Sequence, residues 1–346
     1  METPFYKVDI NKIHDNYKIL CDILNFATVY YATKPNFEEI IIKALVDKNA
    51  SFEISSFNEM QALLDFGVSS EKIICSVPIK SCETIINLYQ KGCRYFVFDS
   101  IVELEKLVIH APDAKKIVRL YVADLIEGEI DLGMYEKDIL SLVKNNEFFS
   151  KNIDGFTFYI LNNQNKFDIF EQVFRRIEGI LEILNKNNLI VNIGGNLPFP
   201  TNTNKSFFAM IEQWYRKFHD KYSVIFLSEP GRTILKDAIT LHTKIILIKE
   251  KSDGCVVYID ASSQIVKLNP TGSITVNGGE CKKNAVKTKY YFYESLCSHY
   301  LLFTREMEER LWIGDTLAIH NYGAYSSCFA NHFHGLSIPK YVTESD

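Results

Sequence analysis

Short apolar runs alternate with amphipathic stretches of helical length through the first two thirds of the chain. The apolar runs are rich in β-branched and aromatic residues, which predicts strands. They cover residues 28–33, 50–54, 72–76, 94–98, 117–122, 153–159, 189–193 and 223–228. Stretches such as "NFEEIIIKALVDK" and "SIVELEKLVIHA" separate them and predict helices. Buried strands that alternate with helices indicate a parallel sheet covered on both faces, and eight such units predict a (β/α)8 barrel.

The pattern changes near residue 240, where β-rich segments follow one another without helices between them. Examples are "ITLHTKIILIKE", "GCVVYIDAS" and "TKYYFYES". The opening "TPFYKVDI" also predicts a strand. We therefore expect an α/β protein with a (β/α)8 TIM barrel at residues 9–239. We expect a C-terminal antiparallel β-barrel domain to be formed by residues 1–8 and 240–346.

Composition and charge narrow the classes of function. The chain has 346 residues, of which 47% are hydrophobic and 23% are charged, with a formal net charge of -5. Charges of both signs are interspersed, which argues against a nucleic-acid partner and against a membrane surface as partner. The longest apolar runs are too short to span a bilayer, and the N-terminus lacks the apolar core of a signal peptide.

The eight cysteines are scattered along the chain and form no CxxC pair. This spacing argues against a zinc site and against a disulfide framework, and it fits a reducing compartment. We therefore expect a cytoplasmic protein that holds no metal.

Polar residues gather where the predicted barrel strands end, and in this barrel class the chemistry lies at the carboxyl ends of the strands. Lys34 follows the first strand, and Glu53 closes the second. The later strand ends contribute Arg119, Tyr159, Gly194, Gly195, Asn196, Glu229 and Arg232. A lysine, two adjacent glycines and a carboxylate near an arginine are therefore expected at one end of the barrel.

Each of these residues is weak evidence when it is taken alone. A strand-end lysine more often reaches solvent, two glycines more often make a tight turn, and an arginine more often lies on the surface. Together they fit one small molecule. Lys34 can form an imine with an aldehyde, Glu229 can hold a proton on a ring nitrogen, and Gly194, Gly195 and Arg232 can bind a phosphate. An aldehyde, a ring nitrogen and a phosphate describe pyridoxal 5'-phosphate.

The chain resembles the fold-type III pyridoxal-phosphate decarboxylases, the ornithine and diaminopimelate decarboxylase family, over essentially its whole length. The motifs that carry the resemblance stand in the family's order: "YYATKPN", "FEISSFNEMQ", "IICSVPIKS", "YFVFDSIVELEKL", "IGGN", "SEPGR" and "GDTLAIHNYGAYSSCFANHFHG". The resemblance implies a decarboxylase, a lyase, in which Lys34 bonds to the cofactor and Glu229 pairs with the pyridine nitrogen. The phosphate contacts that it implies are Gly194, Gly195, Arg232 and Tyr325.

Further site residues follow from the same resemblance. Cys297, in "ESLCSHYLL", falls where the family places a cysteine that reprotonates the product and reaches the partner subunit's site. A homodimer with shared active sites is therefore expected. The remaining cofactor contacts that we expect are Glu53, Arg119, Tyr159 and Asn196.

The sequence departs from the family pattern at three places. Tyr159 replaces the family's stacking histidine, and Asn196 replaces a third glycine. Ornithine-type enzymes carry an acidic residue directly after the cysteine to bind the distal ammonium, whereas this chain has Ser298. A second acidic position of the ornithine-type enzymes aligns near Asn269, which is also uncharged. Each lost charged hydrogen bond costs about 1.5–3 kcal/mol, which argues against a substrate with a free distal ammonium.

We therefore predict an α-decarboxylase of an N-acylated diamino acid of the citryl type, such as N-citrylornithine, in siderophore biosynthesis. A citrate tail favours neutral or basic donors. The substrate contacts that we expect are Asn269, Ser298, His299 and Phe333.

Four other functions are alternatives. A small cofactor-carrier protein would lack the second domain altogether. An ornithine- or lysine-type decarboxylase would make a free polyamine. An amino-acid racemase needs an opposing tyrosine base, where this chain has the decarboxylase's cysteine and "GAY" stretches. A homologue that has lost its cofactor would only bind partners. The missing histidine and third glycine favour this last reading, and it is opposed by Lys34, Glu229, Arg232, Cys297 and Tyr325.

Overall fold

The structure, a computed structural model, describes residues 2–126, 131–161, 166–265, 272–277 and 283–343. The chain divides into two compact units. The barrel unit comprises Tyr17–Lys34 and Leu45–Ile234. The β unit comprises Met1–Asn16, Pro35–Ala44 and Leu235–Asp346, so it takes in a short segment directly after Lys34.

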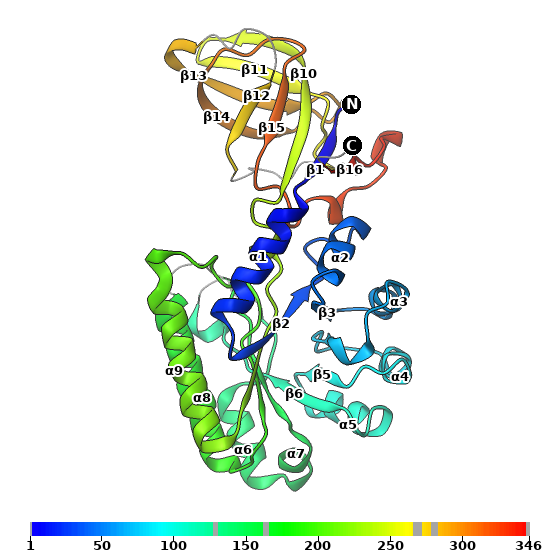
Figure 1. The fold of residues 1–346 in the computed structure, drawn as a ribbon, viewed down its shortest axis with the longest axis vertical. Coiled ribbons are helices and arrows are strands. Elements are labelled where there is room, and N and C mark those ends of the chain that lie inside the picture. Colours follow the sequence, from blue (N-terminus) through cyan, green and yellow to red (C-terminus); the bar gives the residue numbers. More distant parts are fainter. Residues whose placement is uncertain (1, 127–130, 162–165, 266–271, 278–282, 344–346) are drawn as a thin grey trace. The chain divides into compact units, whose positions relative to one another are not determined.

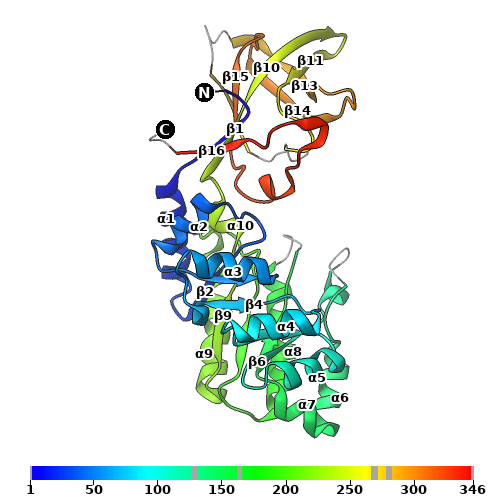
Figure 2. The same cartoon turned by 90° about the vertical axis from the view of Figure 1, so that its right-hand side faces the viewer.

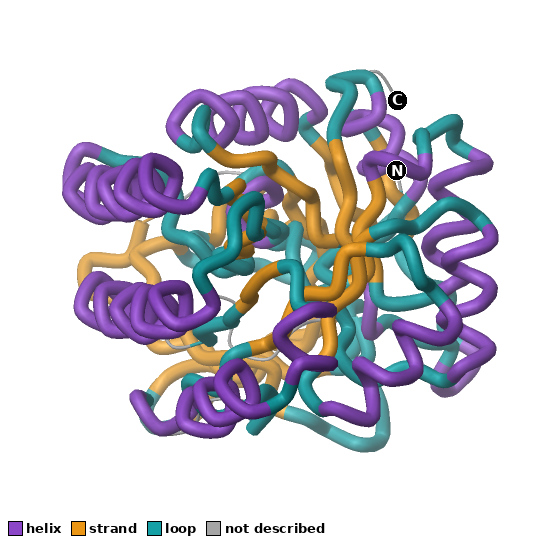
Figure 3. Tube along the Cα trace, turned by 90° about the horizontal axis from the view of Figure 1, so that it is seen from below, coloured by secondary structure: helices purple, strands orange, loops and turns teal. Residues whose placement is uncertain are grey.

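Strands β2 to β9 form a closed parallel barrel in which β9 pairs with β2. These strands are β2 (Ala27–Ala32), β3 (Ser51–Ile54), β4 (Ile73–Cys75), β5 (Tyr95–Phe98), β6 (Lys115–Arg119), β7 (Gly155–Thr157), β8 (Ile190–Asn192) and β9 (Ile225–Ser228). Figure 3 shows helices surrounding the strands. The predicted (β/α)8 barrel is therefore confirmed.

The helices alternate with these strands along the chain. They are α1 (Ile10–Ile23), α2 (Glu39–Val46), α3 (Phe57–Asp65), α4 (Cys82–Gln90), α5 (Ile101–His110), α6 (Glu136–Asn145), α7 (Glu147–Asn152), α8 (Lys166–Leu184), α9 (Lys205–Tyr222) and α10 (Arg232–Leu235). Short 3-10 helices lie at Ser70–Lys72, Ala123–Leu125, Asn202–Asn204, Ser327–Phe329 and Phe333–Gly335.

Serine residues start three of the barrel helices soon after a strand or its loop. The hydroxyl oxygens of Ser56, Ser81 and Ser100 each accept a backbone N–H of the first helical turn. At α3 the Glu59 carboxylate also accepts the Ser56 N–H, which completes a capping box. These caps fix where each helix begins, and so they fix the short loops at the carboxyl ends of β3 and β5.

An apolar cluster forms part of the barrel core. Buried residues of β2, β4, β5, β6, β8 and β9 pack together there: Tyr30, Ile74, Val97, Ile117, Ile190 and Leu227. Larger aromatic side chains fill the layer between strands and helices, where Phe174 contacts Trp214 and Phe226. This packing holds the strand ends in place.

The β unit is built on a mixed sheet. Its strands are β1 (Phe5–Val8), β10 (Ile239–Lys251), β11 (Gly254–Ile259), β12 (Ile274–Asn277), β13 (Lys283–Glu294), β14 (Leu301–Glu309), β15 (Thr316–Ile319) and β16 (Lys340–Val342). Most neighbours pair antiparallel, as predicted, but β11 pairs parallel with β13, and β1 pairs parallel with β16. Figures 1 and 2 both show β1 beside β16, from the two ends of the chain. Parallel pairing is possible here because long connections link these strands.

No helix in the described part of the chain is long and apolar enough to cross a membrane.

Candidate active site

The barrel has a polar layer at the carboxyl ends of its strands. Glu53, Thr157, Asn192 and Ser228 are the last or next-to-last residues of β3, β7, β8 and β9, and all are buried. Glu53 is 4% exposed and Asn192 is fully buried. Buried polar groups are costly unless they are hydrogen-bonded, so this layer is a candidate binding site.

Glu229, directly after β9, is held by donors from two other parts of the barrel. The Ser76 hydroxyl and the Asn192 side-chain amide both donate to its Oε1. Its backbone N–H donates to the Gly194 carbonyl at 2.8 Å. Two donors on one oxygen fix the plane of the carboxylate, which suits it to accept a proton-bearing ring nitrogen.

Glu53 lies close enough to Glu229 and Lys34 for their charges to affect its titration. Burial raises the pKa of Glu53 above its ordinary value, and the negative charge of Glu229 raises it further. The positive charge of Lys34 acts in the opposite direction and is the weaker effect. The structure therefore brings together two carboxyl groups and the lysine that the sequence singled out.

Two cations lie near the ring of Tyr159. The Lys34 Nζ is 5.0 Å from the centre of the Tyr159 ring, and the Arg119 guanidinium carbon is 6.0 Å from it. Both distances fit cation–π contacts. The tyrosine thus presents an aromatic face beside Lys34 at the position where the sequence departs from the family's histidine.

The loop after β8 can hold only glycine at two successive positions. A Cβ on Gly194 would lie 2.5 Å from the Phe158 carbonyl oxygen, and Gly194 also has φ +67. A Cβ on Gly195 would lie 2.2 Å from the Glu229 carbonyl oxygen. The protein's own backbone therefore demands glycine at both positions, and the Gly194 N–H donates to the Asn192 Oδ1 at 2.9 Å.

Asn196, in place of a third glycine, keeps the backbone conformation of this loop. Its φ is +57, a left-handed value that asparagine adopts more readily than most residues. Its side-chain amide donates to the carbonyl oxygens of Ile160 and Leu161, at 3.0 and 2.7 Å. Asn196 therefore ties the loop after β8 to the loop after β7.

Arg232 is the first residue of α10 and is exposed, and Thr233 follows it in the same helix. The Thr233 hydroxyl donates to the Leu197 carbonyl at 2.6 Å. This bond links the segment that carries Arg232 to the loop of Gly194, Gly195 and Asn196. The barrel unit thus holds most of the predicted cofactor contacts on adjoining loops.

The β unit holds the other predicted site residues. Tyr325 has φ +58, rare for a bulky residue, and its N–H donates to the carbonyl of Pro35 at 2.9 Å. Pro35 follows Lys34 in the sequence and belongs to the β unit. Phe333 begins the 3-10 helix Phe333–Gly335. Asn269 lies outside the described residues.

Cys297, Ser298 and His299 are exposed in the loop between β13 and β14. The Cys297 Sγ is 3.7 Å from the Nε2 of His334. The His299 ring stacks on Tyr293 with centroids 4.5 Å apart. The Ser298 hydroxyl donates to Glu294, the last residue of β13.

Glu294 is a buried carboxylate beneath this loop. The Ser263 N–H donates to its Oε2 at 2.8 Å, and the Tyr300 N–H donates to its Oε1 at 3.2 Å. Burial acts to raise the pKa of Glu294, but the hydrogen bonds from Ser263 and Ser298 outweigh burial, so the net pKa lies below its ordinary value. Glu294 is therefore ionised near neutral pH.

Sequence reasoning missed Ser76, Asn192, Glu294 and His334. A signal existed for two of them: Asn192 interrupts the apolar run "LIVNI", and Glu294 interrupts the aromatic run "YYFYES". A polar residue inside a predicted buried strand needs a partner. Ser76 and His334 gave no such signal, since Ser76 is the last residue of the predicted strand 72–76 and His334 lies outside every predicted strand.

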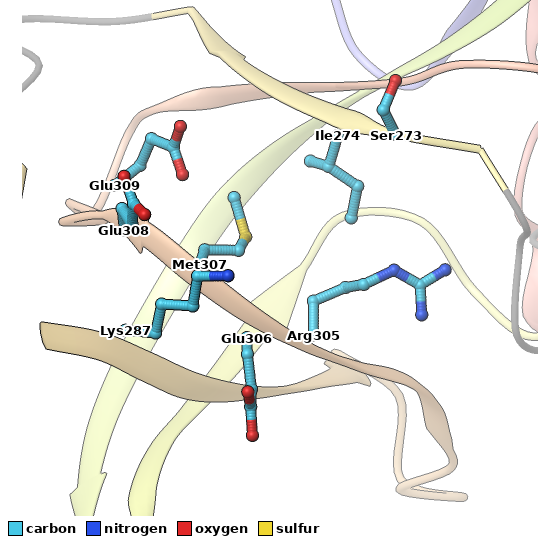
Figure 4. A pocket seen from close by; sticks show the side chains of 8 residues that line it. All are labelled: Ser273, Ile274, Lys287, Arg305, Glu306, Met307, Glu308 and Glu309. Carbon is cyan, nitrogen blue, oxygen red and sulfur yellow. The ribbon is translucent and has the colours of Figure 1, made fainter.

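A pocket of about 300 Å³ also lies in the β unit (Figure 4). It is lined by Ser273, Ile274, Lys287, Arg305, Glu306, Met307, Glu308 and Glu309. Cations and carboxylates both border it, and no residue predicted from the sequence as a site residue lines it. The candidate residues described above lie elsewhere: one group at the strand ends of the barrel unit, and another in the Cys297 loop of the β unit.

Fold and site together define the class, a barrel enzyme that uses pyridoxal phosphate. The sequence profile of a family described as pyridoxal-dependent decarboxylase, pyridoxal binding domain, matches residues 9–236, well over half of the chain. The chain belongs to this family and is a fold-type III pyridoxal phosphate-dependent decarboxylase.

Individual relatives are distant but match nearly the whole chain. A lysine/ornithine decarboxylase of Selenomonas ruminantium is 25% identical over 362 residues, which cover 99% of this chain and 90% of the relative. The ornithine decarboxylase of Caenorhabditis elegans is 22% identical, covering 100% of this chain and 88% of the relative.

Solved structures agree with the fold. The crystal structure of the Paramecium bursaria Chlorella virus arginine decarboxylase superposes with a TM-score of 0.86 at 20% identity, covering 99% of this chain and 97% of the other. A Vibrio vulnificus lysine/ornithine decarboxylase complexed with cadaverine superposes with a TM-score of 0.83 at 20% identity, covering 99% and 95%.

The residues of the barrel fit pyridoxal phosphate. The oriented Glu229 carboxylate and the aromatic face of Tyr159 match its ring nitrogen and its ring, and Lys34 beside Tyr159 supplies an amine for its aldehyde. When bound, the cofactor supplies the electron sink for breaking a carbon–carbon bond.

Proposed function

We propose that the enzyme removes the α-carboxylate of an amino acid whose side chain ends in a free basic group, as in ornithine, lysine or arginine. The names of the relatives support this substrate class, since they are lysine, ornithine and arginine decarboxylases. The observation that carries the proposal is the hydrogen bond from Ser298 to Glu294.

The Ser298 hydroxyl has one proton, and that proton is engaged by Glu294. An ionised carboxylate can only accept, so Ser298 must be the donor of this pair. The exposed side of Ser298 then offers lone pairs, backed by a buried negative charge. Such a group accepts from an ammonium or a guanidinium and repels a carboxylate. Glu294 and Ser298 would thus do jointly what an acidic residue after the cysteine does in ornithine-type enzymes.

An N-acylated diamino acid of the citryl type, as in siderophore biosynthesis, is the second candidate substrate. The observation in its favour is the neutral Ser298 directly after Cys297, followed by His299. An acylated nitrogen carries no charge and does not need a carboxylate partner. The direction of the Ser298 hydroxyl bond weighs against a tail that itself carries carboxylates.

In the barrel, we assign each residue a role. Lys34 bonds covalently to the cofactor, and Glu229, oriented by Ser76 and Asn192, holds the proton on its ring nitrogen. Tyr159 would cover the ring, and the Arg119 guanidinium carbon lies 6.0 Å from the centre of the Tyr159 ring. Phosphate contacts come from Gly194, Gly195, Asn196, Arg232 and Tyr325. Glu53 adjusts the charge beside Lys34.

We further propose a homodimer with shared active sites, in which Cys297 serves the partner's site as the proton donor to the product. The exposure of Cys297, Ser298 and His299 supports this, since the loop is open to a neighbouring chain. The free thiols among the described residues support a cytoplasmic location.

Matched substrates test the substrate class. Decarboxylation of ornithine, lysine and arginine is compared with their side-chain N-acetyl and N-citryl forms, and we expect a higher kcat/KM for a free basic amino acid. A higher value for every acylated form would establish the second candidate instead. Lys34→Ala should abolish turnover and the absorbance of the lysine-bound cofactor, and Lys43→Ala, an exposed lysine of α2, should change neither.

A further inference from the structure

Cys297 and His334 lie side by side although 37 residues separate them in the sequence. The Cys297 Sγ is 3.7 Å from the His334 Nε2, within range of a hydrogen bond to sulfur. Both side chains are exposed, and both belong to the β unit. The imidazole can therefore exchange protons with water as well as with the thiol.

The two residues that follow Cys297 are held in place by contacts with β13. Ser298 is bonded to the buried Glu294, and His299 stacks on Tyr293 with its backbone at φ +52. His334 also has a left-handed backbone, with φ +57, inside its 3-10 helix. Two unusual backbone positions on separate segments bring the thiol and the imidazole together, and such positions concentrate at functional sites.

We propose that His334 is the proton partner of the Cys297 thiol. The role in turnover rests on the proposed function, in which Cys297 donates its proton to the substrate carbon that has lost its carboxylate. The S–H bond breaks, a C–H bond forms, and the thiolate is left. The thiolate then takes a proton from the His334 imidazolium, which becomes neutral imidazole and regains its proton from water. Each turnover thus releases one carbon dioxide and consumes one solvent proton.

The reactivity of the Cys297 thiol tests this pairing without any catalytic assay. The cofactor-loaded protein is treated with limiting iodoacetamide at neutral pH, and alkylation of each cysteine is followed by peptide mass spectrometry. Only the thiolate reacts, so a proton-accepting neighbour speeds alkylation. Cys82, exposed on α4 in the barrel unit, serves as the internal reference.

His334→Asn removes the imidazole and keeps a residue that accepts a left-handed backbone. We expect the alkylation rate of Cys297, relative to Cys82, to fall about three- to fivefold, the size expected of an exposed charged pair. His332→Asn is the matched control, because His332 lies on the same segment and bonds instead to the Leu336 carbonyl. His334→Gln carries the same expectation if the first variant does not fold. An unchanged relative rate, or an equal fall in His332→Asn, would overturn the pairing.

Turnover separates this inference from the proposed function. His334→Asn should lower kcat for the preferred substrate with little change in KM, because the imidazole acts on the thiol and not on substrate binding. If His334→Asn slows alkylation of Cys297 as expected but wild-type protein decarboxylates none of the basic amino acids, the pairing stands and the proposed function fails. If it decarboxylates them and alkylation is indifferent to His334, the pairing fails alone.

Discussion

Glu294 is the residue on which substrate choice depends in our proposal, although its own side chain is fully buried. Glu294→Gln removes the negative charge behind Ser298 and leaves the size of the side chain nearly unchanged. We expect kcat/KM for the free basic substrate to fall roughly tenfold, at the lower end of the loss of a charged hydrogen bond. Activity on the acylated form should change less. Steady-state kinetics on the matched pair measures both.

The exposed Glu308 of β14 supplies the control for this experiment. Glu308→Gln removes one negative charge from the same unit at a distance in sequence from the Cys297 loop, so kinetics should be unchanged. Equal losses on the free and acylated substrates in Glu294→Gln would mean that Glu294 only supports the fold of the loop.

Glu53 gives a prediction about pH. Because burial raises its pKa in the folded chain, folded protein keeps a proton that unfolded protein releases above the ordinary value of 4.5. The contribution of Glu53 to stability should then be lost as pH rises from about 5 through neutrality, by up to about 1.4 kcal/mol per pH unit. Glu53→Gln removes the titrating carboxyl group. In protein freed of cofactor, the urea midpoint of this variant should therefore decline less over this pH range than the midpoint of wild type.

The exposed Glu105 of α5 provides the matched variant, and Glu105→Gln should follow the wild-type pH dependence. Parallel pH curves for wild type and Glu53→Gln would refute a raised pKa at Glu53.

At the scale of elements, the loop after β8 depends on close backbone contact. Gly195→Ala would place a Cβ 2.2 Å from the Glu229 carbonyl oxygen, and neither backbone can give way without moving the other. We expect a loss of about 1–3 kcal/mol of stability, typical of overpacking, together with weaker binding of pyridoxal phosphate. Thermal unfolding and cofactor titration measure the two effects.

Gly179 in α8 offers the opposite case, because nothing lies within 4 Å of a Cβ built there. Gly179→Ala should raise stability by about 0.5–1 kcal/mol, since alanine favours a helix over glycine, and should leave cofactor affinity unchanged. Full cofactor affinity in Gly195→Ala would show that the loop tolerates a side chain.

The order of elements was predictable because each barrel strand is a near-continuous apolar run with a helix after it. Every predicted run overlaps one observed barrel strand; residues 117–122, for example, overlap β6, which starts earlier, at Lys115. Lysines at 115 and 116 hid that start, since a charged pair does not look buried. The parallel pairing of β11 with β13 was also hidden, because pairing across a long connection leaves no local pattern.

The candidate site was predictable where a residue type has a role of its own, as with Lys34 and Glu229. It was not predictable where function depends on a partner distant in sequence. Ser298 is a plain neutral residue in the sequence, and its hydrogen bond to Glu294, on which our proposal of a free basic substrate rests, is visible only in the structure. His334 similarly gains meaning only from its distance to Cys297.

At the scale of the whole molecule, the proposed dimer can be tested by combining two inactive chains. In a shared site Lys34 comes from one chain and Cys297 from its partner, so a mixed dimer of Lys34→Ala and Cys297→Ala chains contains one site with both residues intact. Random exchange makes half of the dimers mixed, with one working site of two, so about a quarter of wild-type activity should return. Decarboxylation after subunit exchange measures the recovery.

Two controls make this experiment decisive. Exchange itself is followed with chains that carry different affinity tags, so that mixed dimers are counted directly. An equimolar mixture of wild type with a double variant, Lys34→Ala with Cys297→Ala, should lose about half of its activity on subunit exchange, because wild-type chains move into mixed dimers that have no complete site. The reason is that each mixed dimer then pairs the intact lysine with a missing cysteine in one site, and the intact cysteine with a missing lysine in the other. No recovery between the two single variants, in samples where mixed dimers are counted, would place Lys34 and Cys297 of one chain in the same site, and full activity of Cys297→Ala alone would show that Cys297 has no part in turnover.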